Sequence, residues 1–130
     1  MNEKVEYWLD LAYEDVDVAK IMLNNGKYLY CGFMCHQTVE KALKAVIARD
    51  CTDDELPPKI HHLQRLAERA GVFTEMSEEQ KMILRKLNPL NIEARYPEYK
   101  NRVASNLNKD ICQELVNETE GLLWWIKQQL

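Results

Sequence analysis

The sequence has few glycines and prolines, four of each in 130 residues, and it has no long apolar run. The longest run, LLWWI at 122–126, is far shorter than the roughly 20 residues that span a bilayer. No segment alternates polar and apolar residues over the length of a strand, and there is no glycine-rich phosphate loop. The first twenty residues are acidic and amphipathic, unlike a signal peptide. These absences predict an all-α, cytoplasmic protein without a membrane segment.

The bulk composition, 46% hydrophobic and 29% charged, predicts a single globular domain over residues 1–130. A net charge of -4 argues against wholesale electrostatic capture of nucleic acid and leaves room only for a local basic patch. Cys31 and Cys35 lie four residues apart beside His36, but Cys51 and Cys112 stand alone, so the second pair of a structural zinc site is missing. We therefore expect reduced, mostly buried thiols, no metal and no cofactor.

Apolar residues recur at steps of three and four in several segments, which predicts helices. NNGK at 24–27 ends the first, and SEEQ at 77–80 is a capping box that opens another. Met82, Ile83 and Leu87 are expected on the apolar face of the latter, and Ile111 on that of the last helix. Residues 51–60 and 91–104 are predicted connections, the second after a break near Pro89. The expected helices lie at about 5–23, 28–50, 62–70, 77–88 and 108–129.

Polar residues form a stripe on the second helix, which is otherwise apolar. At about 100° per residue they fall within an arc of roughly 140°. On spacing alone we favour a solvated face with a Glu40–Lys44 pair. The alternative is the polar wall of a groove. The stripe consists of His36, Gln37, Glu40, Lys41 and Lys44.

The segment NIEARYPEYK at 91–100 places Arg95, Tyr96 and Tyr99 beside Pro97, which breaks a helix. Arginine and aromatic residues on a connection are typical of a recognition surface. His61 and His62, near a helix N-terminus, are candidates for an acid, a base or a phosphate donor, although one of the pair could simply pack against a loop.

The adjacent Trp124 and Trp125 cannot both face the core, because about 100° separates them on a helix. Trp124 points away from the apolar arc. It could lie flat on the surface, but we favour an interface, first of all a symmetric homodimer.

Three motifs in order, CHQTVEKALKA, IHHL and ARYP, resemble those of stand-alone prokaryotic HEPN domains. The resemblance covers roughly residues 7–100, with a final helix that also fits. It implies a four- or five-helix up-and-down bundle that is usually dimeric and is similar to the substrate-binding domains of nucleotidyltransferases. Such domains are often encoded beside a minimal nucleotidyltransferase, as a toxin–antitoxin pair or a nucleotide-handling complex. The resemblance also favours a groove over a solvated face for the polar stripe of the second helix. The positions that match the family motifs are Gln37, Glu40, Lys41, Lys44, His61, Arg95, Tyr96 and Pro97.

Ribonuclease members of the superfamily carry a His four to six residues after the Arg, and that residue is missing here. Arg95 is followed by YPEYKNR, with Asn101 near the expected position, and an amide cannot exchange a proton near pH 7. We therefore favour a binding module over an enzyme. It would engage a nucleotide, a nucleic acid such as RNA, or a minimal nucleotidyltransferase.

In the binding module Arg95 would hold a phosphate or carboxylate, and Tyr96 or Tyr99 would stack on a base. Lys41 and Lys44 would add positive charge. One alternative is a metal-independent ribonuclease toxin that uses His61. Another is a purely structural helical adaptor in which Arg95 pairs with Glu40.

Overall fold

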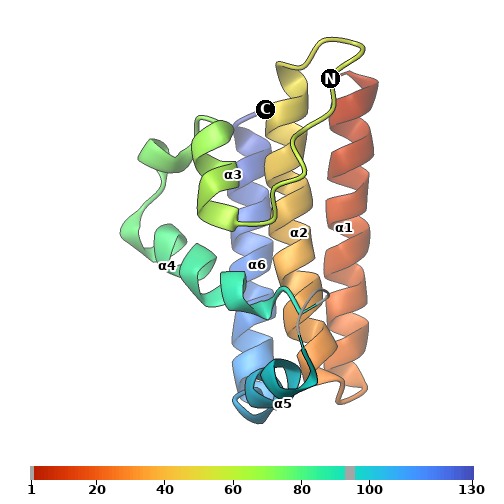
Figure 1. The fold of residues 1–130 in the computed structure, drawn as a ribbon, viewed down its shortest axis with the longest axis vertical. Coiled ribbons are helices and arrows are strands. Elements are labelled where there is room, and N and C mark those ends of the chain that lie inside the picture. The colour runs from red at the N-terminus through yellow and green to blue at the C-terminus, as the bar shows by residue number, and fades with distance from the viewer. Residues whose placement is uncertain (1, 93–95) are drawn as a thin grey trace.

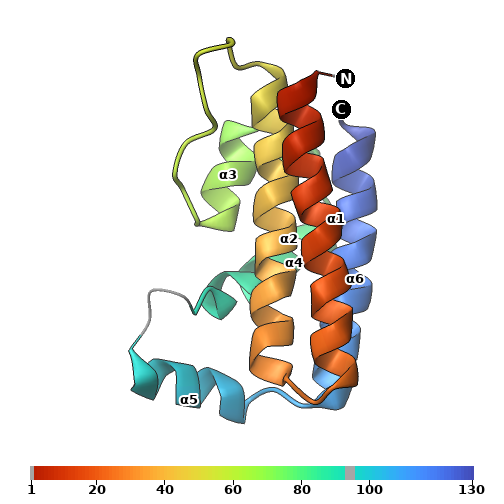
Figure 2. The ribbon, with the colours of Figure 1, turned by 90° about the vertical axis from the view of Figure 1, so that its right-hand side faces the viewer.

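The structure, a computed structural model, describes residues 2–92 and 96–130, and all the regular secondary structure in this part is helical. Three long helices form its body: α1 (Glu3–Asn24), α2 (Tyr28–Arg49) and α6 (Lys109–Gln128). Figure 1 shows α1 and α2 as an antiparallel pair, with α6 beside them and running in the same direction as α2. The two termini therefore lie at the same end of the molecule (Figures 1 and 2). The predicted all-α class is confirmed.

The core forms where the apolar faces of the long helices meet. In α1 the buried residues follow the predicted steps of three and four, from Val5 to Leu23. Two of them, Ala12 and Ala19, have small side chains that let α2 approach closely. α2 is central because it packs against both α1 and α6. Asn2 and Asn108 cap α1 and α6, and the side-chain oxygen of each accepts a hydrogen bond of 2.9 Å from a backbone N–H of the first turn. Gly26 takes the left-handed φ of 72° that the turn between α1 and α2 requires.

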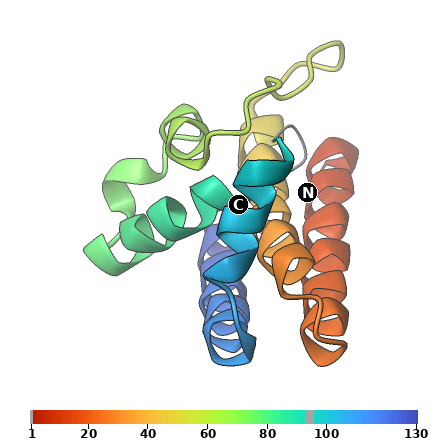
Figure 3. The same cartoon turned by 60° about the horizontal axis from the view of Figure 1, so that its bottom comes forward.

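Three shorter helices connect α2 to α6: α3 (Leu63–Arg69), α4 (Glu78–Leu87) and α5 (Pro97–Ser105). Single 3-10 turns precede and follow α4, at Phe73–Glu75 (η1) and Asn88–Leu90 (η2). α3 and α4 pack on α2, whereas α5 lies across the opposite end of the bundle from the termini (Figures 2 and 3). No helix of the described residues has the length and apolarity needed to cross a membrane.

The short helices correct some of the sequence expectations. The capping box is confirmed: the Gln80 N–H donates to Ser77 Oγ at 3.1 Å, and the Ser77 N–H donates to Gln80 Oε1 at 2.9 Å. The connection expected at 91–104 instead contains α5, because Pro97 begins a helix at its first turn, where no N–H is needed. Met82 and Ile111 were expected on apolar faces, but their exposures of 50% and 40% place them at the solvent edges.

Candidate functional site

A strap, residues 51–62, descends beside α2 without regular structure and leads into α3 (Figures 1 and 2). Its upper part is tied to α1 by one side chain. The Lys4 ammonium donates to the carbonyl oxygens of Thr52, Asp53 and Glu55, the last two at 2.6 and 2.7 Å. Three carbonyl acceptors satisfy the three donors of an ammonium group. The strap is thereby fixed at its start, and the polar stripe of α2 fixes its end.

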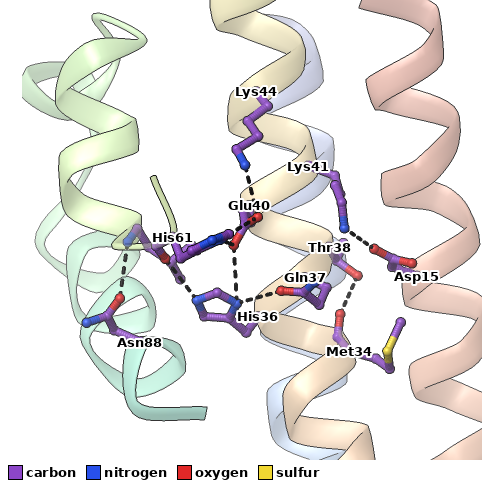
Figure 4. A network of polar contacts seen from close by, with 11 residues as sticks. Asp15, Met34, His36, Gln37, Thr38, Glu40, Lys41, Lys44, His61 and Asn88 are labelled. Carbon is purple, nitrogen blue, oxygen red and sulfur yellow. Dashed lines mark hydrogen bonds and ion pairs between the residues drawn. The ribbon is translucent and has the colours of Figure 1, made fainter. Parts of the chain in front are cut away.

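The polar stripe is largely buried, so the favoured solvated face is wrong for three of its members. His36, Glu40 and Lys44 are 0%, 2% and 6% exposed. The expected ion pair is present: Lys44 Nζ donates to Glu40 Oε2 at 3.1 Å. The same carboxylate lies 3.1 and 3.2 Å from His61 Nδ1, which comes from the end of the strap (Figure 4). Contacts with His61 of the strap, 21 residues from Glu40 and 25 from His36, help to cover the stripe.

His36 holds the backbone of the strap from below. Its Nε2 lies 3.1 Å from the His61 carbonyl oxygen and must therefore carry the proton that it donates. Burial lowers the pKa of His36, although contacts to Gln37 and Glu40 oppose the shift. Its Nδ1 lies 3.1 Å from Gln37 Oε1, an oxygen that accepts a hydrogen bond when Nδ1 carries a proton.

The two lysines of the stripe are occupied within the molecule. Lys41 turns to α1 and donates to Asp15 Oδ2 at 3.2 Å. Burial raises the pKa of Asp15, and the nearby Lys41 opposes that shift. Lys44 Nζ, besides its bond to Glu40, lies 5.5 Å from the centre of the Trp8 ring. Both ammonium groups already have anionic partners, which reduces the charge that they can offer a ligand.

His61 differs from the rest of the network because its side chain is 60% exposed. Its Nδ1 faces the Glu40 carboxylate, an acceptor, so Nδ1 carries the proton of the neutral ring. No hydrogen bond among the described residues uses Nε2 of this ring. The network therefore fixes both the position and the tautomer of an exposed imidazole.

A groove of about 350 Å³ lies next to this histidine, where α3 begins and α4 ends. A hollow of about 110 Å³, lined by His61, His62, Asn88 and Asn91, adjoins it, since both share His62 and Asn88. No acidic residue is among the described residues that line either space. The groove is lined by His62, Gln64, Leu84, Arg85, Asn88, Pro89 and Tyr99.

Hydrogen bonds between its walls shape the groove. Asn88 Oδ1 accepts from the Leu63 N–H at 3.1 Å, which joins the end of α4 to the start of α3 and leaves the Asn88 NH₂ as a donor. The Tyr99 hydroxyl donates to the Pro89 carbonyl oxygen at 2.8 Å, which joins α5 to the turn after α4. Tyr99 and His62 were already candidates from the sequence. Gln64, Arg85 and Asn88 were not, because their convergence depends on how the short helices pack.

The other predicted site residues are more scattered. Arg95 lies outside the described residues, and with it the expected pairing to Glu40. Tyr96 is 81% exposed at the start of α5. Trp124 is 64% exposed on α6, whereas Trp125 is partly buried against the core. The structure thus brings Tyr99 to the groove and His61 to the adjoining hollow, and it places the tryptophans on another part of the surface.

Metal-ligand chemistry has no obvious place in the described part of the chain. No group of three or more His, Cys, Asp or Glu residues in it has an arrangement that could hold a metal ion. Cys31, Cys35 and Cys112 are buried free thiols, and Cys51 is partly exposed.

The described residues define a small helical domain with a buried polar network beside a surface groove. The HEPN domain model matches residues 5–129, and the chain belongs to the HEPN domain family. The fold is similar to that of TT1696 from Thermus thermophilus, with a TM-score of 0.82 and 20% identity over 99% of this chain and 100% of that one. It is also similar to ST0689, described as an archaeal HEPN homologue, with a TM-score of 0.72 and 20% identity over 99% and 98% of the two chains. No curated protein matches the sequence.

Proposed function

We propose that this HEPN domain is a binding module that holds a phosphate group of a nucleotide or of RNA in the groove between α3, α4 and α5. The observation that carries the proposal is the composition of the groove wall. Arg85 and His62 supply cationic or donor groups, and no carboxylate lies among the described lining residues to repel an anion. Such a wall suits an anionic ligand of modest size.

Each polar group of the wall has a role in this proposal. The planar guanidinium of Arg85 is exposed and can bond two phosphate oxygens at once. The side-chain amides of Gln64 and Asn88 add neutral donors. Tyr96, whose ring is exposed at the start of α5, is available to stack on a base. The family resemblance keeps Arg95, which lies outside the described residues, as a further candidate for binding an anion.

The test compares one arginine that lines the groove with another exposed arginine that does not. ATP, GTP and a short fluorescent RNA are titrated against wild type, Arg85→Ala and Arg69→Ala, where Arg69 is exposed on α3 outside the groove lining. The Arg85→Ala variant loses one charge-assisted contact of about 1.5–3 kcal/mol, so it should bind roughly tenfold or more weakly than wild type. Equal weakening by both variants would show non-specific charge attraction, and undiminished binding by Arg85→Ala would remove the groove as the site.

We further propose that the domain associates through α6, as a homodimer or with a minimal nucleotidyltransferase in a toxin–antitoxin-type pair. The supporting observation is Trp124 on α6, whose side chain is 64% exposed, because Trp is enriched at interface hot spots. Light scattering should give a dimer mass for wild type and a monomer mass for Trp124→Glu. Ile21→Glu, an exposed apolar residue on α1, is the matched control. A monomer mass for wild type would contradict the homodimer.

A further inference from the structure

We infer that His61 forms a subsite that reads a ligand hydroxyl, and that it selects ribose over deoxyribose next to the phosphate held in the groove. The inference rests on the proposed function, because it requires a phosphate-bearing ligand there. It adds a second kind of recognition, directed at the sugar. The residues that build it are His61, Glu40 and His36.

The first step is the tautomer. Two oxygens of a buried carboxylate lie 3.1 and 3.2 Å from His61 Nδ1, and a carboxylate can only accept. In the neutral form of the ring the proton is therefore on Nδ1, and Nε2 presents a lone pair. A hydroxyl group can donate to this lone pair, whereas a phosphate oxygen, a carbonyl oxygen or an ether oxygen cannot.

The second step is rigidity. The His61 ring is held through Glu40, which is itself fixed by Lys44 at 3.1 Å. The His61 backbone is held separately, because its carbonyl oxygen accepts from His36 Nε2 at 3.1 Å. An acceptor that is fixed at both ends loses little conformational freedom when a ligand binds, so its hydrogen bond contributes more fully to affinity.

The third step is place. His61 lines the hollow of about 110 Å³ that shares His62 and Asn88 with the larger groove. Liquid water takes up about 30 Å³ per molecule, so the hollow has room for a few polar atoms and not for a nucleobase with its sugar. With a phosphate between His62 and Arg85, the inference places a hydroxyl of its own sugar in this adjoining hollow. The 2′-hydroxyl is the group by which a protein distinguishes RNA from DNA.

The competing explanation is that the Glu40–His61 contact only fastens the strap to α2. That explanation predicts a change in stability when His61 is replaced, but no change in the ratio of affinities for ribose and deoxyribose ligands. The ratio is therefore the quantity to measure.

The experiment uses the full chain and four fluorescent oligonucleotides of one sequence, with ribose, deoxyribose, 2′-O-methyl or 2′-fluoro sugars. A single exposed hydrogen bond of about 0.5–1.5 kcal/mol predicts that wild type binds the ribose form about 3- to 10-fold more tightly than the deoxyribose form. The 2′-O-methyl group accepts but cannot donate, so it should bind as weakly as deoxyribose. The 2′-fluoro form should do the same.

Two variants complete the test. His61→Ala should lower the ribose-to-deoxyribose ratio to about one, whereas Lys59→Ala, an exposed change on the same strap, should preserve it. A wild-type ratio near one, tight binding of the 2′-O-methyl form, or a ratio preserved in His61→Ala would each overturn the inference while leaving phosphate binding intact. Absence of binding by all four oligonucleotides and by ATP would instead overturn the proposed function. The wild-type comparison needs no variant, so it holds even if His61→Ala does not fold.

Discussion

Replacing Lys44 by Met should destabilise the protein strongly, because it leaves a buried carboxylate without its cation. Glu40 and Lys44 are 2% and 6% exposed, and their charged atoms lie 3.1 Å apart. At an effective dielectric constant of about 20 the gross attraction is roughly 5 kcal/mol. Removing one partner of a buried pair typically costs about 3–5 kcal/mol. His61 still bonds the carboxylate, so we expect a loss near 3 kcal/mol, or about 10 °C in Tm.

The assay is urea and thermal unfolding at neutral pH, with a matched control in an exposed pair. Lys20 lies 2.7 Å from Glu120, and their side chains are 43% and 44% exposed, so Lys20→Met should cost less than about 1 kcal/mol. The double variant Glu40→Met with Lys44→Met removes both charges and should recover most of the loss. A cost below about 1 kcal/mol for Lys44→Met, or a double variant less stable than either single one, would refute the reasoning.

Three further outcomes can be checked independently. Burial holds the pKa of His36 below its ordinary 6.5, so the unfolded chain binds the extra proton first and stability should fall as pH drops below about 6.5. In His36→Gln the urea midpoint should therefore depend less on pH between 7.5 and 5.5. The same pH dependence as in wild type would contradict this. Lys4→Met removes the donor to the three strap carbonyls, so hydrogen exchange in residues 51–56 should accelerate while that of α6 stays constant. Ser77→Ala removes the cap of α4 and should cost about 1 kcal/mol, whereas the exposed Thr74→Ala should cost clearly less.

The helices could be predicted from the sequence because their signals are local. The buried positions of α1, the left-handed Gly26 and the capping box at Ser77 depend on residues no more than a few positions apart. The Glu40–Lys44 pair was predicted for the same reason, since residues four apart on a helix lie side by side. The pattern of three motifs also identified the family.

The candidate site could be predicted only in part. His61 and Tyr99 were chosen from the sequence, and the structure places them at adjoining hollows. Arg85 was not chosen, because nothing within its helix marks an exposed arginine as part of a groove. α5 was missed because a proline after a helix is equally a stop and the first residue of a new helix.

The sequence by itself determined the all-α class, the extents of the long helices and the residues available for chemistry, since helix periodicity and caps are properties of short segments. Only the tertiary structure decided what those residues face. The polar stripe of α2 has the same pattern whether water or the strap covers it. The strap reaches it through contacts such as His61 with Glu40, twenty-one positions apart. Burial, tautomer and groove shape all follow from such long-range contacts, which no local pattern encodes.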